Sequence, residues 1–229
     1  MLACGRIPAP LPAMVIGAGP DVLVVENSDT YWVAAEILGH RRNHPVGVLA
    51  WGCGKAFPSQ VATLGVDVAG RGPVAGRVWY WGDLDPPGLI IAADAAATAS
   101  ATAGPQILPA TGLWAAMANF PVQEPGSIDW SAAPGRRWLG GQLWDHLARV
   151  HRASGRVAQE AVHAELIAAW GKRGQRLTRG QRPSACPNPS RHRKPDTDTD
   201  TMPNSQPIFG IFGQVRTGCA ARDSNPNPR

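Results

Sequence analysis

Cysteine is scarce in this sequence, and the few cysteines that occur lie far apart. The 229 residues include four of them, and no two form a Cys-x-x-Cys pair. A disulfide framework or a zinc ribbon needs closely spaced, paired cysteines, so both are excluded. Isolated thiols are typical of a reducing compartment, and we expect a cytoplasmic protein. The four positions are Cys4, Cys53, Cys186 and Cys219.

Long apolar runs are also missing. The sequence has no stretch of about 18 uninterrupted apolar residues, so a transmembrane helix is not predicted. Prolines at positions 8, 10 and 12 interrupt the segment where a secretory signal peptide needs its apolar stretch. The 26 glycines follow no Gly-X-Y period, which excludes a collagen-like chain. We therefore expect no association with a membrane.

Charged residues are few, at 17% of the chain against about 25% in ordinary globular domains. The net charge of +5 is unevenly distributed. Residues 171–229 hold 11 Lys and Arg against 4 Asp, whereas residues 1–170 hold 11 basic against 13 acidic residues. A basic balance favours nucleic-acid binding only where the charge lies on the folded part. The excess of positive charge is therefore no evidence of such binding by residues 1–170.

Composition divides the chain into three regions: an N-terminal extension (1–20), a folded domain (21–170) and a disordered basic tail (171–229). The tail has 8 Pro, a DTDTDT repeat and a single short apolar patch, too little to offset its ordering entropy. Two alternatives stay open. The tail could bind phosphates, or it could be translated from a shifted frame, because residues 222–226 match the translated antisense of a transfer-RNA T-arm.

Strand and helix patterns alternate along the folded domain. Short buried-type runs predict strands, and apolar residues at helical spacing before a glycine predict helices. This order is typical of an α/β fold with a parallel sheet and helices on both faces, followed by C-terminal helices. The predicted strands are 21–25, 46–51 and 78–81, and the predicted helices are 29–38, 57–64, one from residue 86, 139–153 and 156–170.

Three acidic residues follow two of these strands. Glu26 comes directly after the first strand, and Asp83 and Asp85 follow the third. The carboxyl ends of parallel strands share one edge, and residues two apart in an extended segment point the same way. Three carboxylates placed together repel one another and need a cation. Oxygen-only ligands favour Mg²⁺ or Mn²⁺ over zinc, and such an ion serves phosphoryl chemistry.

A purely structural interpretation of the same residues is also open. In it Asp83 caps the helix that begins at Pro86, Asp85 makes a turn, and Glu26 is solvated in a loop.

Four sequence segments resemble a known family. They are VVEN at 24–27, VLAWGCG at 48–54, WYWGDLDPPGL at 79–89 and RVAQE at 156–160. Their order and spacing resemble a Toprim domain. More closely, they are similar to the nuclease subunit of Wadjet plasmid-defence systems, a relative of the A subunit of type VI topoisomerases. The resemblance covers about residues 21–168, and the segment at 79–89 is its most specific part.

The resemblance implies a Mg²⁺-dependent DNA endonuclease within an anti-plasmid complex. Glu26 would be the general acid/base or a metal ligand, and Asp83 and Asp85 would be metal ligands. Glu160 would be a further ligand or simply a solvated helix residue. Implied partners are DNA and condensin-like ATPase subunits, and a homodimer is compatible with the family. The alternative is a truncated, non-catalytic Toprim module that scaffolds or binds DNA.

The sequence departs from the family pattern at its start. The family's subunit has an N-terminal arm and a winged-helix module before the Toprim domain, and only about 20 residues precede it here. We therefore expect either a fragment or a chain that relies on a partner to hold DNA.

Basic and aromatic residues give weaker predictions. Lys55 follows a glycine turn near the predicted site, and the segment 40–44 forms a basic loop with two His and two Arg. Both could touch DNA phosphates, or both could be ordinary surface. The nine tryptophans could stack on bases if exposed, but their placement in strand and helix patterns predicts that most belong to the core.

Overall fold

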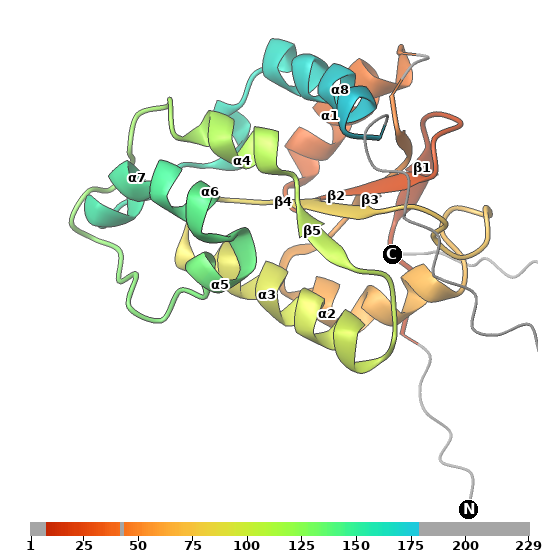
Figure 1. The fold of residues 1–229 in the computed structure, drawn as a ribbon, viewed down its shortest axis with the longest axis horizontal. Helices are drawn as coiled ribbons and strands as arrows, with labels where there is room; N and C mark the ends of the chain where they lie inside the picture. Colours follow the sequence, from red (N-terminus) through yellow and green to blue (C-terminus); the bar gives the residue numbers. More distant parts are fainter. Residues whose placement is uncertain (1–7, 42–43, 179–229) are drawn as a thin grey trace, which may run out of the picture. The chain divides into compact units, whose positions relative to one another are not determined.

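The computed structural model describes residues 8–41 and 44–178. Within them lies a five-stranded sheet with the strand order β1-β3-β2-β4-β5 (Figure 1). β1 pairs with β3 in antiparallel fashion, and the other three pairings are parallel. The strands are β1 (Ala13–Val15), β2 (Asp21–Val25), β3 (Val46–Trp51), β4 (Val78–Trp81) and β5 (Ile107–Pro109).

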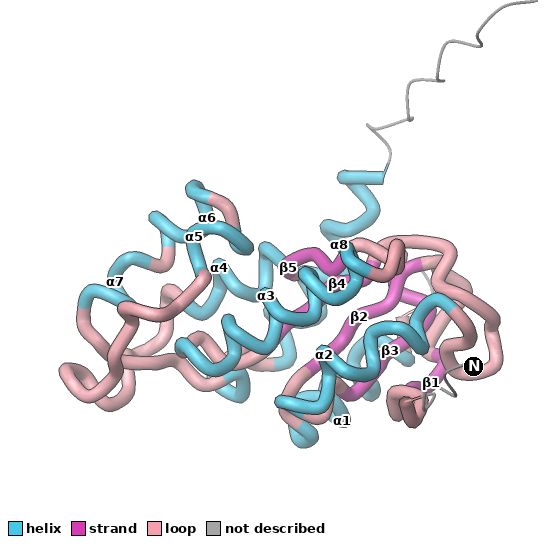
Figure 2. Tube along the Cα trace, turned by 90° about the horizontal axis from the view of Figure 1, so that it is seen from below, coloured by secondary structure: helices cyan, strands magenta, loops and turns pink. Residues whose placement is uncertain are grey.

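The central strands are buried because helices cover both faces of the sheet. All five residues of β2 are buried, as are five of the six in β3, a pattern that requires cover on both sides. Two helical segments, α2 and α3, lie along one face (Figure 2). On the other face α1 packs against α8, and α8 against α4. Their bounds are α1 (Ser28–Gly39), α2 (Phe57–Gln60), α3 (Pro86–Ala101), α4 (Thr111–Met117) and α8 (Ala164–Thr178).

The predicted α/β fold and its three parallel strands are confirmed. Two further strands were not predicted. β1 lies within the segment expected to be an N-terminal extension, and β5 lies in the Gly/Pro-rich stretch 104–134. Each is only three residues long, so neither has enough residues to show a period of two.

Of the two long C-terminal helices predicted, the first, 139–153, was wrong, and the second, 156–170, was correct only from residue 164 onward, where α8 begins. Residues 139–153 do not form one helix, because Gly140 has a φ of +82° and separates α5 (Gly135–Leu139) from α6 (Gly141–His146). A third short helix, α7 (Ala148–Arg152), follows. Residues 156–163 lie outside the second helix: they include the short 3-10 turn η3 (Gln159–Ala161), and α8 begins only at Ala164.

The predicted boundary at residue 171 falls inside α8, which continues to Thr178. The rest of the predicted tail, together with the basic residue Arg42, lies outside the described residues. No helix in the described part of the chain has both the length and the apolar character needed to cross a bilayer.

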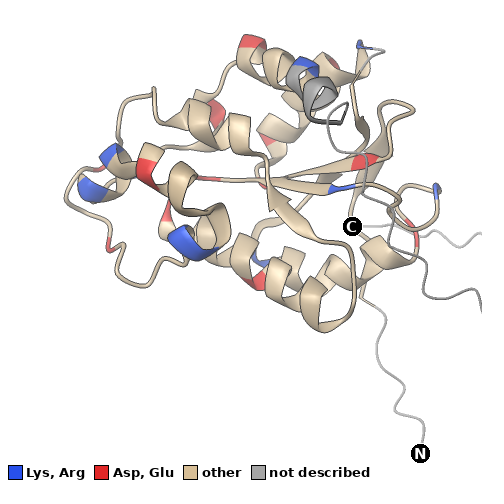
Figure 3. Ribbon diagram, in the orientation of Figure 1, with Lys and Arg blue, Asp and Glu red and all other residues tan. Residues whose placement is uncertain are grey.

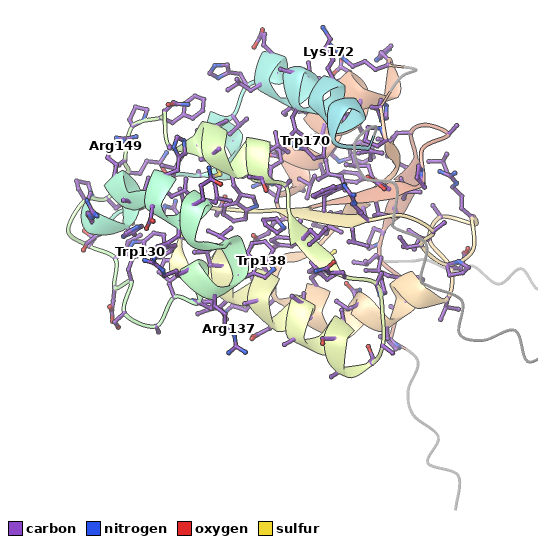
Figure 4. The ribbon with its side chains drawn as sticks, viewed as in Figure 1. Trp130, Arg137, Trp138, Arg149, Trp170 and Lys172 are labelled. Atoms are coloured by element: carbon purple, nitrogen blue, oxygen red, sulfur yellow. The ribbon has the colours of Figure 1, made fainter. Side chains whose placement is uncertain are left out.

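Most tryptophans belong to the core, as predicted. Eight of the nine are buried or half-buried against it, whereas Trp32 on α1 is 62% exposed. Trp138 of α5 lies between that helix and the sheet (Figure 4), where its ring packs edge-on against Tyr80 of β4. Trp170 of α8 packs in the same way against Trp79. These aromatic side chains thus pack α5 and α8 against the sheet.

Candidate active site at the carboxyl edge of the sheet

Glu26 occupies the point where β2 ends between its two parallel neighbours. The preceding residue, Val25, is in register with Trp51 of β3 and Trp81 of β4, and the Glu26 N–H donates to the Trp81 carbonyl at 3.1 Å. The side chain lies over Gly82: a Cβ at that position would come within 2.0 Å of Glu26 Oε2. The glycine before Asp83 therefore makes room for the Glu26 carboxylate.

The Glu26 carboxylate is held by a tyrosine. Tyr80 Oη donates a hydrogen bond of 2.9 Å to Glu26 Oε2. The pKa of Glu26 is raised to about 7: burial is the largest cause and the negative charges of Asp83 and Asp85 add to it, while the hydrogen bonds from Tyr80 and from the Asp83 backbone oppose the shift. Burial and the Glu26 charge also raise the pKa of Tyr80 well above its ordinary value, so its hydroxyl remains a donor.

Asp83 follows β4 and receives a hydrogen bond from a distant part of the chain. Its Oδ1 accepts from the Gln159 backbone N–H at 2.8 Å, whereas Oδ2 accepts none from any residue that the structure describes. Burial, together with the Asp85 charge, raises the pKa of Asp83, while the Gln159 N–H and the Arg156 charge oppose the shift. Asp83 is therefore a carboxylate held at one oxygen, beside other negative charges.

Asp85 begins α3. It is 8% exposed, and its Oδ1 accepts the Gly88 N–H at 2.8 Å as the N-cap of that helix. Its Oδ2 lies 3.9 Å from Arg156 Nη1. The structural interpretation of this motif is therefore partly correct, but the cap is Asp85 rather than Asp83. A Cβ at Gly88 would come within 2.4 Å of the Asp83 carbonyl oxygen, so this glycine lets the helix start close behind the two aspartates.

The structure brings Glu26, Asp83 and Asp85 into one electrostatic neighbourhood, and Glu26 is not the solvated loop residue of the structural interpretation. Within residues 8–41 and 44–178, however, no three His, Cys, Asp or Glu side chains are grouped closely enough to hold a metal ion. The three carboxyl groups are nevertheless close enough for like-charge repulsion to act between them: Asp83 and Asp85 raise the pKa of Glu26, and Asp85 raises that of Asp83. By its chemistry this donor set suits a hard divalent cation, which would relieve the repulsion.

Sequence reasoning missed four residues around these carboxylates. Tyr80 was assigned only to a buried strand, and the segment containing Arg156 and Gln159 was assigned to a helix. Asn27 caps α1, accepting from the N–H groups of Asp29 and Thr30; this cap could have been recognised from an Asn directly before the helical pattern.

Glu160 lies beside the site without joining the carboxylates directly. It is exposed, and it accepts a hydrogen bond from Asn27 Nδ2. This contact is with Asn27, the residue after Glu26, and not with one of the three carboxylates. The role of Glu160 as a further metal ligand therefore stays a prediction.

The predicted basic loop does not face this site. Its described members, His40, Arg41 and His44, lie between the end of α1 and the start of β3, at the opposite edge of the sheet from Glu26. His44 is buried, with its Nε2 2.9 Å from the Leu38 carbonyl, so for this residue neither alternative, DNA contact or ordinary surface, is correct. Lys55, by contrast, is exposed in the 3-10 turn η1 (Gly54–Ala56) that follows β3 at the site's own edge.

The fold and the acidic edge define the class of this protein: an α/β domain with a mostly parallel sheet and three coupled acidic residues beyond its strand ends. Residues 11–170 match a protein-family model described as the C-terminal part of the Wadjet protein JetD. The match covers most of the chain, and the chain belongs to this family. It includes β1 and ends within α8. A comparison with curated proteins finds no match.

Proposed function

We propose that this chain is a Toprim-like nuclease domain that cleaves DNA phosphodiester bonds with Mg²⁺ or Mn²⁺ as part of a cytoplasmic, Wadjet-type anti-plasmid complex. The observation that carries the proposal is the electrostatic coupling of Glu26, Asp83 and Asp85 at the carboxyl edge of the sheet, in a chain of the JetD family. The pKa values of Glu26 and Asp83 are raised, and neighbouring carboxyl groups with perturbed pKa values are typical of functional sites.

Each site residue has a role in this proposal. Asp83 and Asp85 would hold the ion, and Glu26 would be a further ligand or transfer a proton. When bound, a divalent cation lowers the pKa of attacking water and stabilises the leaving oxygen. Glu26 is suited to proton transfer because its pKa of about 7 lies near neutral pH. Tyr80 keeps the Glu26 carboxylate oriented through its hydrogen bond.

The charge distribution supports a role for partners. Residues 1–170 carry 13 acidic against 11 basic residues, which gives little general attraction for DNA. The short helices α5 and α7 each carry two Arg residues, and Figure 3 shows these basic segments on the ribbon. Residues 135–156 contain five Arg and one Asp. We propose that these helices contact the DNA backbone, while condensin-like ATPase subunits or a second copy of the chain provide most of the DNA-binding affinity.

The proposal is tested in the assembled complex with plasmid DNA. Asp83→Asn and Glu26→Gln should each lower Mg²⁺-dependent cleavage at least about 100-fold, because each removes a charge that the reaction needs. Asp94→Asn is the matched control, since Asp94 is exposed on α3 away from the strand ends. Undiminished cleavage by both variants, or by the wild type in EDTA, would overturn the nuclease assignment.

A second candidate is a non-catalytic Toprim module that scaffolds the complex or binds DNA. Two observations favour it. Residues 1–170 carry a slight net negative charge, and in the described part of the chain no three His, Cys, Asp or Glu side chains are grouped closely enough to bind a metal ion. It is distinguished by plasmid protection in cells. A scaffold requires the chain but tolerates Asp83→Asn, whereas a nuclease loses protection with that variant.

A further inference from the structure

Gln159 is a fully buried amide in a segment that crosses the candidate site. Its side chain is 0% exposed, and a buried amide is tolerated only where its polar atoms are hydrogen-bonded. Its Oε1 accepts from the Asn27 backbone N–H at 2.9 Å, and its Nε2 donates to the Trp81 carbonyl at 2.8 Å. Asn27 is the residue after Glu26, and Trp81 ends β4 two residues before Asp83. One side chain therefore links the ends of β2 and β4.

The main chain around Gln159 binds the same region. The Gln159 N–H donates to Asp83 Oδ1 at 2.8 Å. Val157 and Leu84 form an isolated antiparallel β-bridge with two backbone hydrogen bonds, of 2.9 and 3.2 Å. The segment therefore runs antiparallel to residues 83–85. Arg156 approaches Asp85 and also pairs with Glu124 at 3.3 Å. Residues 156–160 thus contact the immediate surroundings of all three acidic residues.

We propose that Gln159 is a positioning residue: it fixes the end of β2 against the end of β4 and thereby sets the separation of Glu26 from Asp83. This inference rests on the proposed function, because the separation of Glu26 from Asp83 matters only if both residues belong to a site for a divalent ion. Gln159 acts through Asn27, Trp81 and its own N–H, not by touching substrate or ion.

The chemistry of the position favours glutamine over its closest alternatives. The side chain must accept one hydrogen bond and donate another, across a distance that spans two strand ends. Leucine has a similar size but would leave the Asn27 N–H without its partner and would take from the Trp81 carbonyl one of its two hydrogen bonds, leaving only that from the Glu26 N–H. Asparagine keeps the amide, but it is one methylene shorter and cannot reach both groups. Groups that orient metal-binding side chains typically affect metal affinity roughly 10- to 100-fold.

The test measures ion binding directly. The full 229-residue chain is titrated with Mg²⁺ and separately with Mn²⁺, and the rise in the unfolding temperature is followed as a function of ion concentration. We expect Gln159→Leu and Gln159→Asn to need roughly 10- to 100-fold more ion than the wild type for half of the rise. Each variant is compared with its own ion-free midpoint, so a general loss of stability does not mimic the effect. Gln142→Leu is the control, since Gln142 is an exposed glutamine on α6.

Cleavage by the assembled complex is the second readout. If Gln159 positions the carboxylates, the variants should recover most of their kcat at saturating Mg²⁺, with the KM for plasmid DNA unchanged. Half-saturation at the wild-type concentration, combined with a lower ion-free midpoint, would show a purely structural residue and overturn the inference while leaving the nuclease proposal intact. A wild-type chain that responds to neither ion and does not cleave would overturn both.

Discussion

At the scale of single residues, two glycines of the Gly-Asp-x-Asp-x-x-Gly motif have different physical roles. A Cβ on Gly82 would meet the Glu26 carboxylate at 2.0 Å, whereas a Cβ on Gly88 would meet the backbone oxygen of Asp83 at 2.4 Å. A carboxylate at the end of a flexible side chain can move aside, but backbone at the start of a helix cannot.

This difference predicts separable effects of the same substitution. Gly82→Ala should change the unfolding free energy by less than about 1 kcal/mol while lowering cleavage by the complex, because it displaces Glu26. Gly88→Ala should cost about 1 to 3 kcal/mol through overpacking. Urea unfolding and cleavage assays on both variants give the comparison. Equal losses of stability in the two would contradict the geometry.

The raised pKa of Glu26 predicts a pH-dependent cost to stability. The folded state holds the proton more tightly than the unfolded chain, whose carboxyl has the ordinary value near 4.5. Protonated Glu26 therefore contributes to folding stability fully below about pH 4.5, and this contribution is lost as the pH rises through about 7. Above that range the folded protein carries a charge that it disfavours.

Glu26→Gln removes this titration. In EDTA the variant should gain about 1 to 3 kcal/mol of stability relative to the wild type at pH 8, and the gain should disappear toward pH 4. Urea midpoints of both proteins across this range provide the measurement, with Glu36→Gln on the exposed side of α1 as the control. A difference that stays constant with pH would show that burial of Glu26 carries no such cost.

At the scale of elements, Asp85 has two roles, and a single substitution cannot show which of them a change in stability or activity comes from. It caps α3 through Oδ1 and presents a negative charge to Arg156 through Oδ2. We predict that Asp85→Ala lowers the unfolding free energy by about 0.5 to 2 kcal/mol, the usual cost of a lost N-cap. Asp85→Asn keeps a capping oxygen and should cost less, while still removing the charge proposed to bind the ion.

Thermal unfolding in EDTA separates the two variants, and ion-dependent cleavage should be lost in both. If Asp85→Ala were as stable as Asp85→Asn, the capping oxygen of residue 85 would contribute nothing to the stability of α3.

The elements that sequence could predict are those whose local pattern agrees with their tertiary place. β2 and β4 are mostly buried runs that are followed within one or two residues by an acidic side chain, so both the parallel sheet and the location of Glu26 and Asp83 follow from them. Residues 156–160 are different, because Gln159 is placed by hydrogen bonds to Asn27 and Trp81, more than 70 residues away. A local helical pattern carries no information about such partners.

Tyr80 shows the same limit within a correctly predicted strand. Its burial was expected, since it belongs to a buried-type run, but its hydroxyl contact with Glu26 depends on the register between β2 and β4. Register is set by the packed sheet as a whole and is not visible in either strand alone.

At the scale of the whole molecule, α8 connects the site's framework to the end of the described chain. Ile167 is fully buried, Trp170 packs on Trp79 of the sheet, and a Cβ on Gly171 would come within 3.0 Å of Leu38 on α1. α8 thus packs against both the sheet and α1, the helix whose N-cap, Asn27, is hydrogen-bonded to Gln159. Loss of α8 should therefore weaken the fold and loosen the site edge.

Two truncations test where the folded domain ends. A chain ending at residue 178 keeps all of α8, and because the composition of the remaining tail is too poor in apolar residues to form a core, its unfolding midpoint should match that of the full chain. A chain ending at residue 163 loses the buried Ile167 and the Trp170 contact, and burying one such side chain is worth about 1.5 to 3 kcal/mol. Its midpoint should fall by several degrees in thermal unfolding. A comparable fall for the chain ending at 178 would show instead that the tail packs on the domain.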